Sequence, residues 1–110
     1  MARLSPRDVG LAATNNHIAM SYYFGRDYEQ CVKAVRHQFT MYPGYPMSGK
    51  WLAASLGQLD RIEEARAALA AAIAESSGSF ETTVRKRLRW MRPEDYEHML
   101  DGLRKAGWQG

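Results

Sequence analysis

Side chains that commonly carry chemistry are few and scattered in this sequence. The histidines are His17, His37 and His98, and the single cysteine is Cys31. Neither His17 nor His37 has another His, Cys or acid at an i+4 ligand spacing. His98 has acidic neighbours on a predicted helix, a pattern that a solvated helix face explains better than a metal site. Because a structural zinc site needs four Cys or His ligands, we expect no metal and no cofactor.

Covalent and phosphate chemistry find equally little support. We interpret Cys31 as a small core residue rather than a nucleophile. The segment GYPMSGK (44–50) resembles part of a phosphate-binding loop, but it lacks the first glycine at the right distance and no strand precedes it. No acid, base and nucleophile can be combined into a catalytic set. The sequence therefore predicts a protein that is not an enzyme.

A basic cluster lies near the C-terminus, at Arg85, Lys86, Arg87, Arg89 and Arg92. Such a cluster could contact phosphates, with Trp90 available for stacking on a base. Its members are spread around a helix rather than along one stripe, and three acidic residues follow between positions 94 and 97. We therefore expect a solvated or ion-paired cap. A nucleic-acid-binding module that uses residues 85–92 remains the alternative function.

The composition is that of an ordinary globular domain. The chain has 110 residues, 45% of them hydrophobic, and a net charge of +3, which suits a single domain. No apolar run approaches the roughly 18 residues that a membrane span needs. The beginning, MARLSPRD, lacks the apolar segment of a secretory signal. We expect a cytoplasmic location and no membrane partner.

A repeat of 34 residues organises the helices that would position these side chains. In each unit the matching residues lie at offsets 0, 3, 7 and 10, which is one face of an α-helix. The three sets are Tyr28, Cys31, Val35 and Gln38, then Ile62, Ala65, Leu69 and Ala72, then Tyr96, Met99, Leu103 and Ala106. Upstream, Ile18 pairs with Leu52, Ala19 with Ala53 and Tyr22 with Leu56 at the same spacing. The pattern predicts repeated helical hairpins.

Six helices follow from the pattern, over residues 8–24, 27–41, 46–58, 61–75, 80–91 and 93–107. Gly25 suits the C-terminal cap of the first helix. Asp60 lies at the corner between the third and fourth helices, and Asp tolerates the left-handed conformation better than most residues. Pro93 opens the last helix as its first residue.

The segment LAASLGQLDRIEEARAALAAAI (52–73), and Pro43 twelve residues after Cys31, make the chain similar to the tetratricopeptide repeat (TPR) family. The resemblance covers residues 12–78 well and 79–110 in part. Departures are an extra residue after Gly25, Asp60 in place of the family's glycine and Ser77 in place of a proline. The resemblance implies an all-α, right-handed solenoid. Its parts would be a lead-in (1–11), two repeats (12–45 and 46–79) and a modified repeat that serves as a cap (80–110).

The later part of the chain has EARAALAAAIA (64–74) and then RKRLRWMRPEDYEHMLDGLRKAGW (85–108). These segments are similar to the closing part of TPR regions in proteobacterial signalling proteins. In those proteins such arrays follow an adenylyl or guanylyl cyclase domain or a winged-helix domain. No cyclase residue lies in these 110 positions. The resemblance therefore implies an accessory module of a bacterial signalling protein and no activity of its own.

In the TPR family, the first helix of each hairpin lines a concave groove that binds a protein or peptide. The implied groove residues here are Asn16, Met20, Tyr23, Met47, Lys50, Trp51 and Arg85. Ala13, His17, Phe24, Ala54, Gln58, Glu81, Val84, Leu88 and Arg92 would lie beside them. Aromatic and Met anchors with a few polar donors are typical of a peptide-binding surface. The alternative for Tyr23, Phe24 and Trp51 is that they pack between the hairpins. We expect a protein–protein interaction scaffold.

The first helix is apolar on several sides, through Ile18, Met20, Tyr22, Tyr23 and Phe24. A helix of this kind is normally buried by another element. Two explanations remain open at this point. Either the chain is the C-terminal piece of a longer repeat array, or it forms a homodimer through its N-terminal helices.

Overall fold

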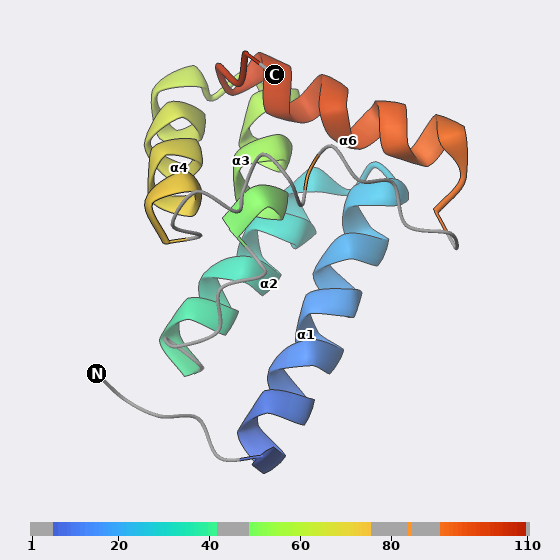
Figure 1. Ribbon diagram of the computed structural model, residues 1–110, viewed down its shortest axis with the longest axis vertical. Coiled ribbons are helices and arrows are strands. Elements are labelled where there is room, and N and C mark those ends of the chain that lie inside the picture. The colour runs from blue at the N-terminus through green and yellow to red at the C-terminus, as the bar shows by residue number, and fades with distance from the viewer. Residues whose placement is uncertain (1–5, 42–48, 76–83, 85–90, 110) are drawn as a thin grey trace.

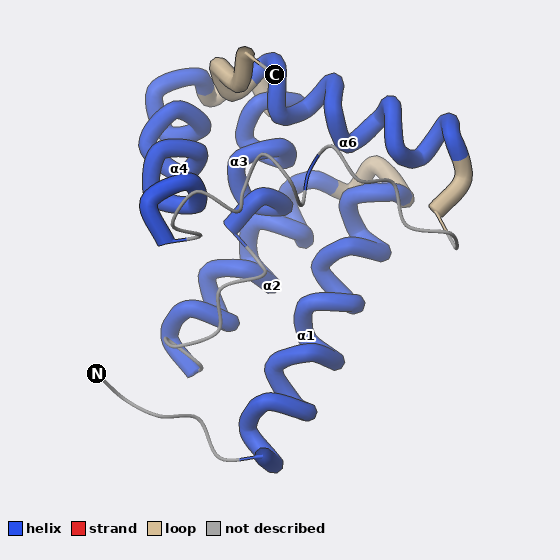
Figure 2. The backbone as a smooth tube through the Cα atoms, viewed as in Figure 1, coloured by secondary structure: helices blue, strands red, loops and turns tan. Residues whose placement is uncertain are grey.

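The structure is a computed structural model, and it describes residues 6–41, 49–75, 84 and 91–109. Within these residues the chain is all-α, and no strand is present. The five described helices are α1 (Pro6–Phe24), α2 (Tyr28–Met41), α3 (Gly49–Gln58), α4 (Ile62–Glu75) and α6 (Pro93–Lys105) (Figures 1 and 2). The helix predicted over 80–91 lies outside the described residues, apart from Val84 and Met91, which are both buried.

The first four helices form two antiparallel hairpins that lie side by side (Figure 1). α1 packs against α2, and α3 packs against α4. The hairpins meet mainly where α3 packs against α2. The all-α prediction is confirmed. The ends of the described helices lie within two residues of the predicted ones, as is usual for such boundaries, except that α3 begins at Gly49, three residues after its predicted start.

The turns of the two hairpins repeat the same hydrogen bonds 34 residues apart. In the first turn, Arg26 N–H donates to Tyr23 O (3.0 Å) and Asp27 N–H to Tyr22 O (2.9 Å). In the second, the same two bonds join Asp60 to Gly57 (3.1 Å) and Arg61 to Leu56 (3.0 Å). This pattern is the Schellman motif that ends many helices.

The left-handed residue of each turn is not a glycine. Arg26 has φ 64° and Asp60 has φ 61°. The prediction for Asp60 is confirmed. The prediction that Gly25 caps the first helix is wrong by one residue, because the extra residue Arg26 takes the left-handed position.

The core confirms the helical face that the repeat defines. The residues at offsets 3, 7 and 10 are at most 6% exposed in all three units, and those at offset 0 are half-buried. The polar member, Gln38, is fully buried between the helices of the first hairpin. It accepts a hydrogen bond from Asn15 Nδ2 (2.7 Å) and donates one to Ala12 O (3.1 Å), which offsets the cost of burying its amide.

Helix α6 does not lie alongside the two hairpins. It crosses over the C-terminal ends of α1 and α3 (Figure 1) and packs mainly against α3. The crossing is close because glycines face it. A Cβ at Gly102 would lie 2.8 Å from Ala54 O, and one at Gly57 would lie 3.0 Å from Ala106 N. As predicted, α6 begins at Pro93, and Gly107 (φ 110°) follows its end.

Candidate functional site

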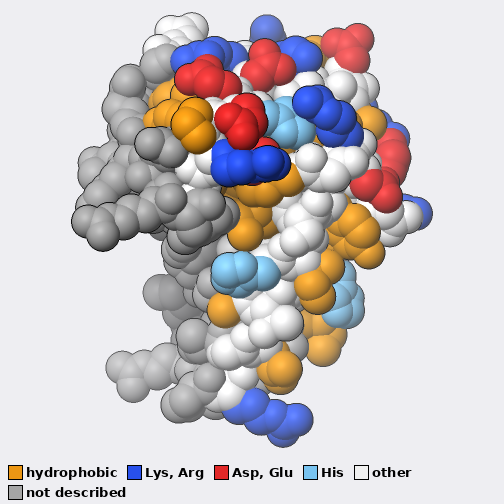
Figure 3. Space-filling view, turned by 90° about the vertical axis from the view of Figure 1, so that its right-hand side faces the viewer, with side chains coloured by type: hydrophobic (Ala, Val, Ile, Leu, Met, Phe, Trp, Pro, Cys, Tyr) orange, Lys and Arg blue, Asp and Glu red, His pale blue; other side chains and the backbone are white. Residues whose placement is uncertain are grey.

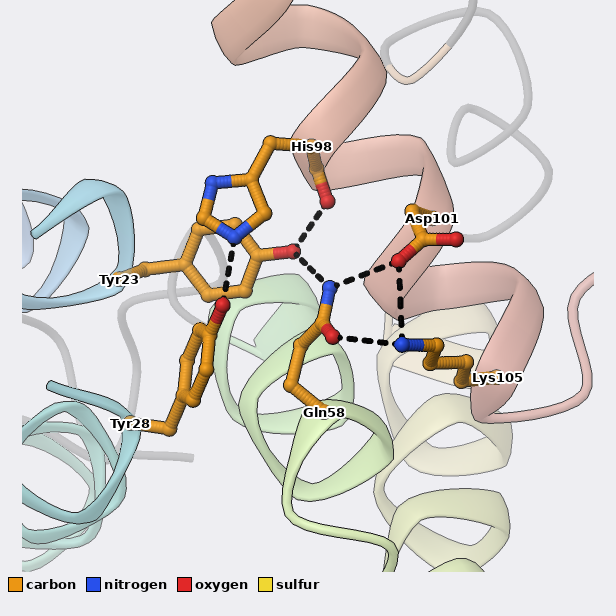
Figure 4. A network of polar contacts seen from close by, with 6 residues as sticks. All are labelled: Tyr23, Tyr28, Gln58, His98, Asp101 and Lys105. Carbon is orange, nitrogen blue, oxygen red and sulfur yellow. Dashed lines mark hydrogen bonds and ion pairs between the residues drawn. The ribbon is translucent and has the colours of Figure 1, made fainter. Parts of the chain in front are cut away.

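A polar network fastens α6 to the ends of the helices beneath it (Figure 4). The Tyr23 hydroxyl donates to His98 O, and Gln58 Nε2 donates to Asp101 Oδ2 (3.1 Å) and to the Tyr23 hydroxyl (3.3 Å). Lys105 Nζ donates to Gln58 Oε1 (2.9 Å) and pairs with Asp101 (3.3 Å). The Tyr28 hydroxyl and His98 Nε2 share a hydrogen bond of 2.7 Å. Residues from four helices are thus joined at one place.

An aromatic cluster centred on Tyr23 lies beneath this network. The Tyr23 ring stacks on the His98 ring, with centroids 4.4 Å apart, and contacts the rings of Phe24, Tyr28 and Trp51 at 5.4–5.8 Å. Trp51 also contacts Phe24 edge-on at 5.4 Å. Such pairs each contribute about 0.5–1.5 kcal/mol beyond the burial of their area.

Burial favours the neutral forms of the Tyr23 and His98 side chains. Burial raises the pKa of Tyr23 well above its usual value. Burial and the nearby Arg26 guanidinium lower the pKa of His98, although Asp101 and Asp95 act in the opposite direction. Both rings are therefore uncharged at neutral pH. Neutral Tyr23 on α1 bonds α6 through His98 O, and the neutral His98 ring bonds Tyr28 on α2, so α6 is tied to both helices.

The predicted groove residues fall into three groups. Tyr23, Trp51 and Asn16 are buried, at 0%, 1% and 8% exposed. Met20 and Lys50 are half-buried, and burial lowers the pKa of Lys50, whose Nζ lies 5.3 Å from the centroid of the Trp51 ring. Met47 and Arg85 lie outside the described residues. Of the flanking positions, Ala54 and Val84 are buried, Ala13, Phe24 and Gln58 are half-buried, His17 and Arg92 are exposed, and Glu81 and Leu88 are not described.

The expectation that Tyr23 and Trp51 line an open groove is corrected by their burial. α6 of the same chain covers Tyr23, and the aromatic cluster encloses Trp51. A partner could touch either ring only after this packing came apart. The sequence pattern did not reveal this, because the same helical stripe serves a groove or a packed helix.

The outer face of α1 carries three exposed apolar side chains. Among the described side chains of the first hairpin, only Met41 on α2 is a more exposed large hydrophobic residue. Leu11, Ile18 and Tyr22 are 44%, 46% and 37% exposed. Their spacing of seven and four places them, with the exposed Thr14, on one stripe of the helix. We call Leu11, Thr14, Ile18 and Tyr22 the α1 stripe. Sequence reasoning noted Ile18 and Tyr22 but missed Leu11, which the same spacing could have identified.

No Asp, Glu, Lys or Arg occurs between positions 9 and 25, so the centre of this face carries no formal charge. Figure 3 shows hydrophobic and uncharged side chains over the middle of this face, with charged ones mainly near α6 and a basic patch at the lower end. The hydroxyls of Thr14 and Ser21 are already satisfied. Thr14 Oγ1 donates to Gly10 O (3.1 Å) and Ser21 Oγ to His17 O (2.9 Å). Covering this face would therefore leave neither donor unpaired.

Other candidate sites are weaker. The basic cluster lies outside the described residues except for Arg92, which pairs with Asp95 (3.2 Å) and Glu94 (3.5 Å). Among the described residues, no group of three His, Cys, Asp or Glu side chains could hold a metal ion. None of the described helices is both long and apolar enough to cross a membrane. A shallow depression between α4 and the C-terminus is lined by Arg66, Leu69, Ala70, Ile73, Ala106, Gly107 and Gln109.

Comparison of the chain with protein-family models gives no match, and comparisons with curated proteins and with solved structures give no significant match either. We therefore infer function from the residues and geometry of this chain.

Proposed function

We propose that this chain is a non-catalytic protein–protein interaction module of TPR type that binds a partner protein through the outer face of α1. The α1 stripe is the observation that carries the proposal. Three large apolar side chains more than a third exposed, in a row on an uncharged helix face, are typical of a surface that another protein covers.

The repeat strengthens this interpretation. Ile18 and Tyr22 occupy the positions of Leu52 and Leu56 in the second hairpin, which are 8% and 1% exposed. In α3 those positions are covered, and α3 packs against α2, α4 and α6. The α1 stripe is thus a packing face of the repeat that has no neighbour within the described chain.

Binding in the concave groove, the other route that the sequence suggested, is less favoured because α6 covers Tyr23 and holds Gln58. A nucleic-acid module has no specific observation in its favour, since the described member of the basic cluster, Arg92, is paired with acids. We therefore place the partner on α1.

Photo-crosslinking tests the proposal without knowledge of the partner. Benzoylphenylalanine is placed at position 18 of the full chain, expressed in the cells that naturally make it. The matched control carries the same group at position 33, where Lys33 is exposed on α2. We expect a discrete covalent protein adduct from position 18 and none from position 33. Equal adducts, or none at position 18, would contradict the proposal.

A further inference from the structure

We infer that the partner of the α1 stripe is a second copy of this chain, docked with α1 antiparallel to its counterpart about a two-fold axis near Thr14 and Asn15. The inference rests on the proposed function and names the occupant of the same face. It is carried by the symmetry of the stripe about its own centre and by its distribution of charge.

A two-fold interface must be self-complementary, because the same patch is used on both copies. In an antiparallel pair centred between residues 14 and 15, residues whose numbers sum to 29 lie opposite each other. Leu11 then faces Ile18 of the second copy, and Ile18 faces the second Leu11. Both residues are exposed to a similar extent, 44% and 46%, so two equal apolar contacts flank the axis.

The centre of the stripe suits close approach of two helices. Thr14 is the smallest member of the stripe, and its hydroxyl is already bonded to Gly10 O. A threonine there lets two helix axes come near the 8–10 Å that is usual for packed helices. Burial of this centre brings no charged group out of water, since residues 9–25 contain none.

The ends of the stripe supply the electrostatic match. The same register places the exposed Arg7 opposite Tyr22 of the second copy, since these numbers also sum to 29. A guanidinium over a tyrosine face is an attractive cation–π arrangement. With Arg7 just beyond one end of the α1 stripe and the Tyr22 ring at the other, this helix face matches its own reversed copy. A parallel pair would instead bring the two arginines together.

The other described hairpin helices with large solvent faces lack this property. α2 exposes Glu29 and Lys33, and α4 exposes Glu63 and Arg66. A partner that covers either helix must meet charges of both signs. The face of α1, with its uncharged centre and its central symmetry, favours a copy of itself over a partner that would bring charges to that centre.

Sedimentation velocity of the purified full chain provides the first test. We expect a species of twice the chain mass of 12.5 kDa that dissociates on dilution. Ile18→Glu should give a monomer with unchanged helical circular dichroism, because residue 18 is not part of the core. Lys33→Glu, the matched control on α2, should still dimerise. A wild-type chain that stays monomeric at submillimolar concentration would overturn the inference.

Disulfide trapping tests the register. Cys31 is first replaced by alanine, the residue at the equivalent position 65. Under mild oxidation, Thr14→Cys should link to its own copy. Leu11→Cys alone should not, because residues seven apart along a helix are about 10 Å apart along the axis. A mixture of Leu11→Cys and Ile18→Cys chains should link with each other. Efficient self-linkage of Leu11→Cys would indicate a parallel pair and overturn the register.

The outcomes separate this inference from the proposed function. A monomer in solution whose position 18 still crosslinks in cells to a protein of another mass overturns the second copy as occupant but keeps the function. An adduct of two identical chains supports both. No adduct at position 18 contradicts the function itself.

Discussion

The first helices of the two complete hairpins, α1 and α3, carry related residues at matching positions but have different surroundings. Ile18 and Tyr22 on α1 are 46% and 37% exposed, whereas Leu52 and Leu56 on α3 are 8% and 1% exposed. The turns that follow the two helices have the same hydrogen bonds. The difference in exposure therefore comes from the neighbours of each helix. A position in the repeat specifies a face that packs, but it does not specify which element packs there.

α6 sharpens this contrast. It crosses α3 where Gly57 and Ala54 face Gly102, and the two helices are so close that there is no room for a Cβ at Gly102. α1 offers an uncharged outer face with no described helix on it, and its own glycine, Gly10, has no atom within 4 Å of an added Cβ. One helix is thus enclosed by its own chain, while the other keeps a face available for a partner.

The largest expected effect is the loss of stability when Leu56 is truncated, compared with truncation of Tyr22 at the matching position of α1. Leu56→Ala should destabilise the fold by about 3 kcal/mol, because it leaves a cavity in a fully packed site. Tyr22→Ala should change the stability of the monomer by less than about 0.5 kcal/mol, as for most exposed sites. Urea denaturation at low protein concentration measures both. Similar losses for the two variants would show that α1 and α3 are equally enclosed.

Adding a methyl group at a glycine of each region gives effects of opposite sign. Gly102→Ala should destabilise by about 2 kcal/mol, because its Cβ would meet Ala54 across the crossing. Gly10→Ala should stabilise by up to about 1 kcal/mol, because alanine is the better helix former and the space is open. Thermal unfolding of both variants provides the measurement. If Gly102→Ala were tolerated, the close crossing of α3 and α6 would be refuted.

The two turns, in contrast, should respond alike. Arg26 and Asp60 adopt left-handed conformations that cost a non-glycine residue about 1–2 kcal/mol. Glycine relieves this strain, but it also loses more backbone entropy on folding than other residues, which reduces the net gain in stability. Arg26→Gly should therefore stabilise the fold by about 0.5–1 kcal/mol, and Asp60→Gly should act in the same direction by less, because aspartate tolerates the left-handed conformation better than arginine. A gain at one turn and a loss at the other, measured by urea unfolding, would contradict their equivalence.

The hairpins were predictable because their information is local. Offsets of 3, 7 and 10 from Tyr28, Ile62 and Tyr96 identify the buried face of three helices from the sequence alone, and Pro93 marks the start of α6. The exposed Ile18 was not predictable from its repeat equivalent, Leu52, because exposure depends on which helix lies alongside. The repeat supplies only the residue type that such a face prefers.

The candidate site was predictable in part for the same reason. Helical spacing selected Tyr23 and Trp51 as contact residues of a groove for another protein, whereas both are buried within the chain. The occupant near Tyr23 is α6, held through Gln58, Asp101 and Lys105. These contacts join residues 43 and 47 positions apart, and no periodic pattern encodes a contact between a polar side chain and a crossing helix.

The smallest expected effect is a pH dependence confined to the region that α6 covers. Burial and Arg26 lower the pKa of His98 in the folded chain, so the unfolded chain binds a proton first as the pH falls. The contribution of neutral His98 to stability is therefore complete above about pH 6.5, the usual histidine pKa, and decreases below it. Urea unfolding of the wild type should weaken between about pH 7.5 and about pH 5.5 more than that of His98→Gln. His17→Gln removes an exposed histidine of α1 and should keep the wild-type slope. If His98→Gln and the wild type changed in parallel, the neutral ring stacked on Tyr23 would not help to hold α6, and the contrast between the covered and open helices would depend on packing alone.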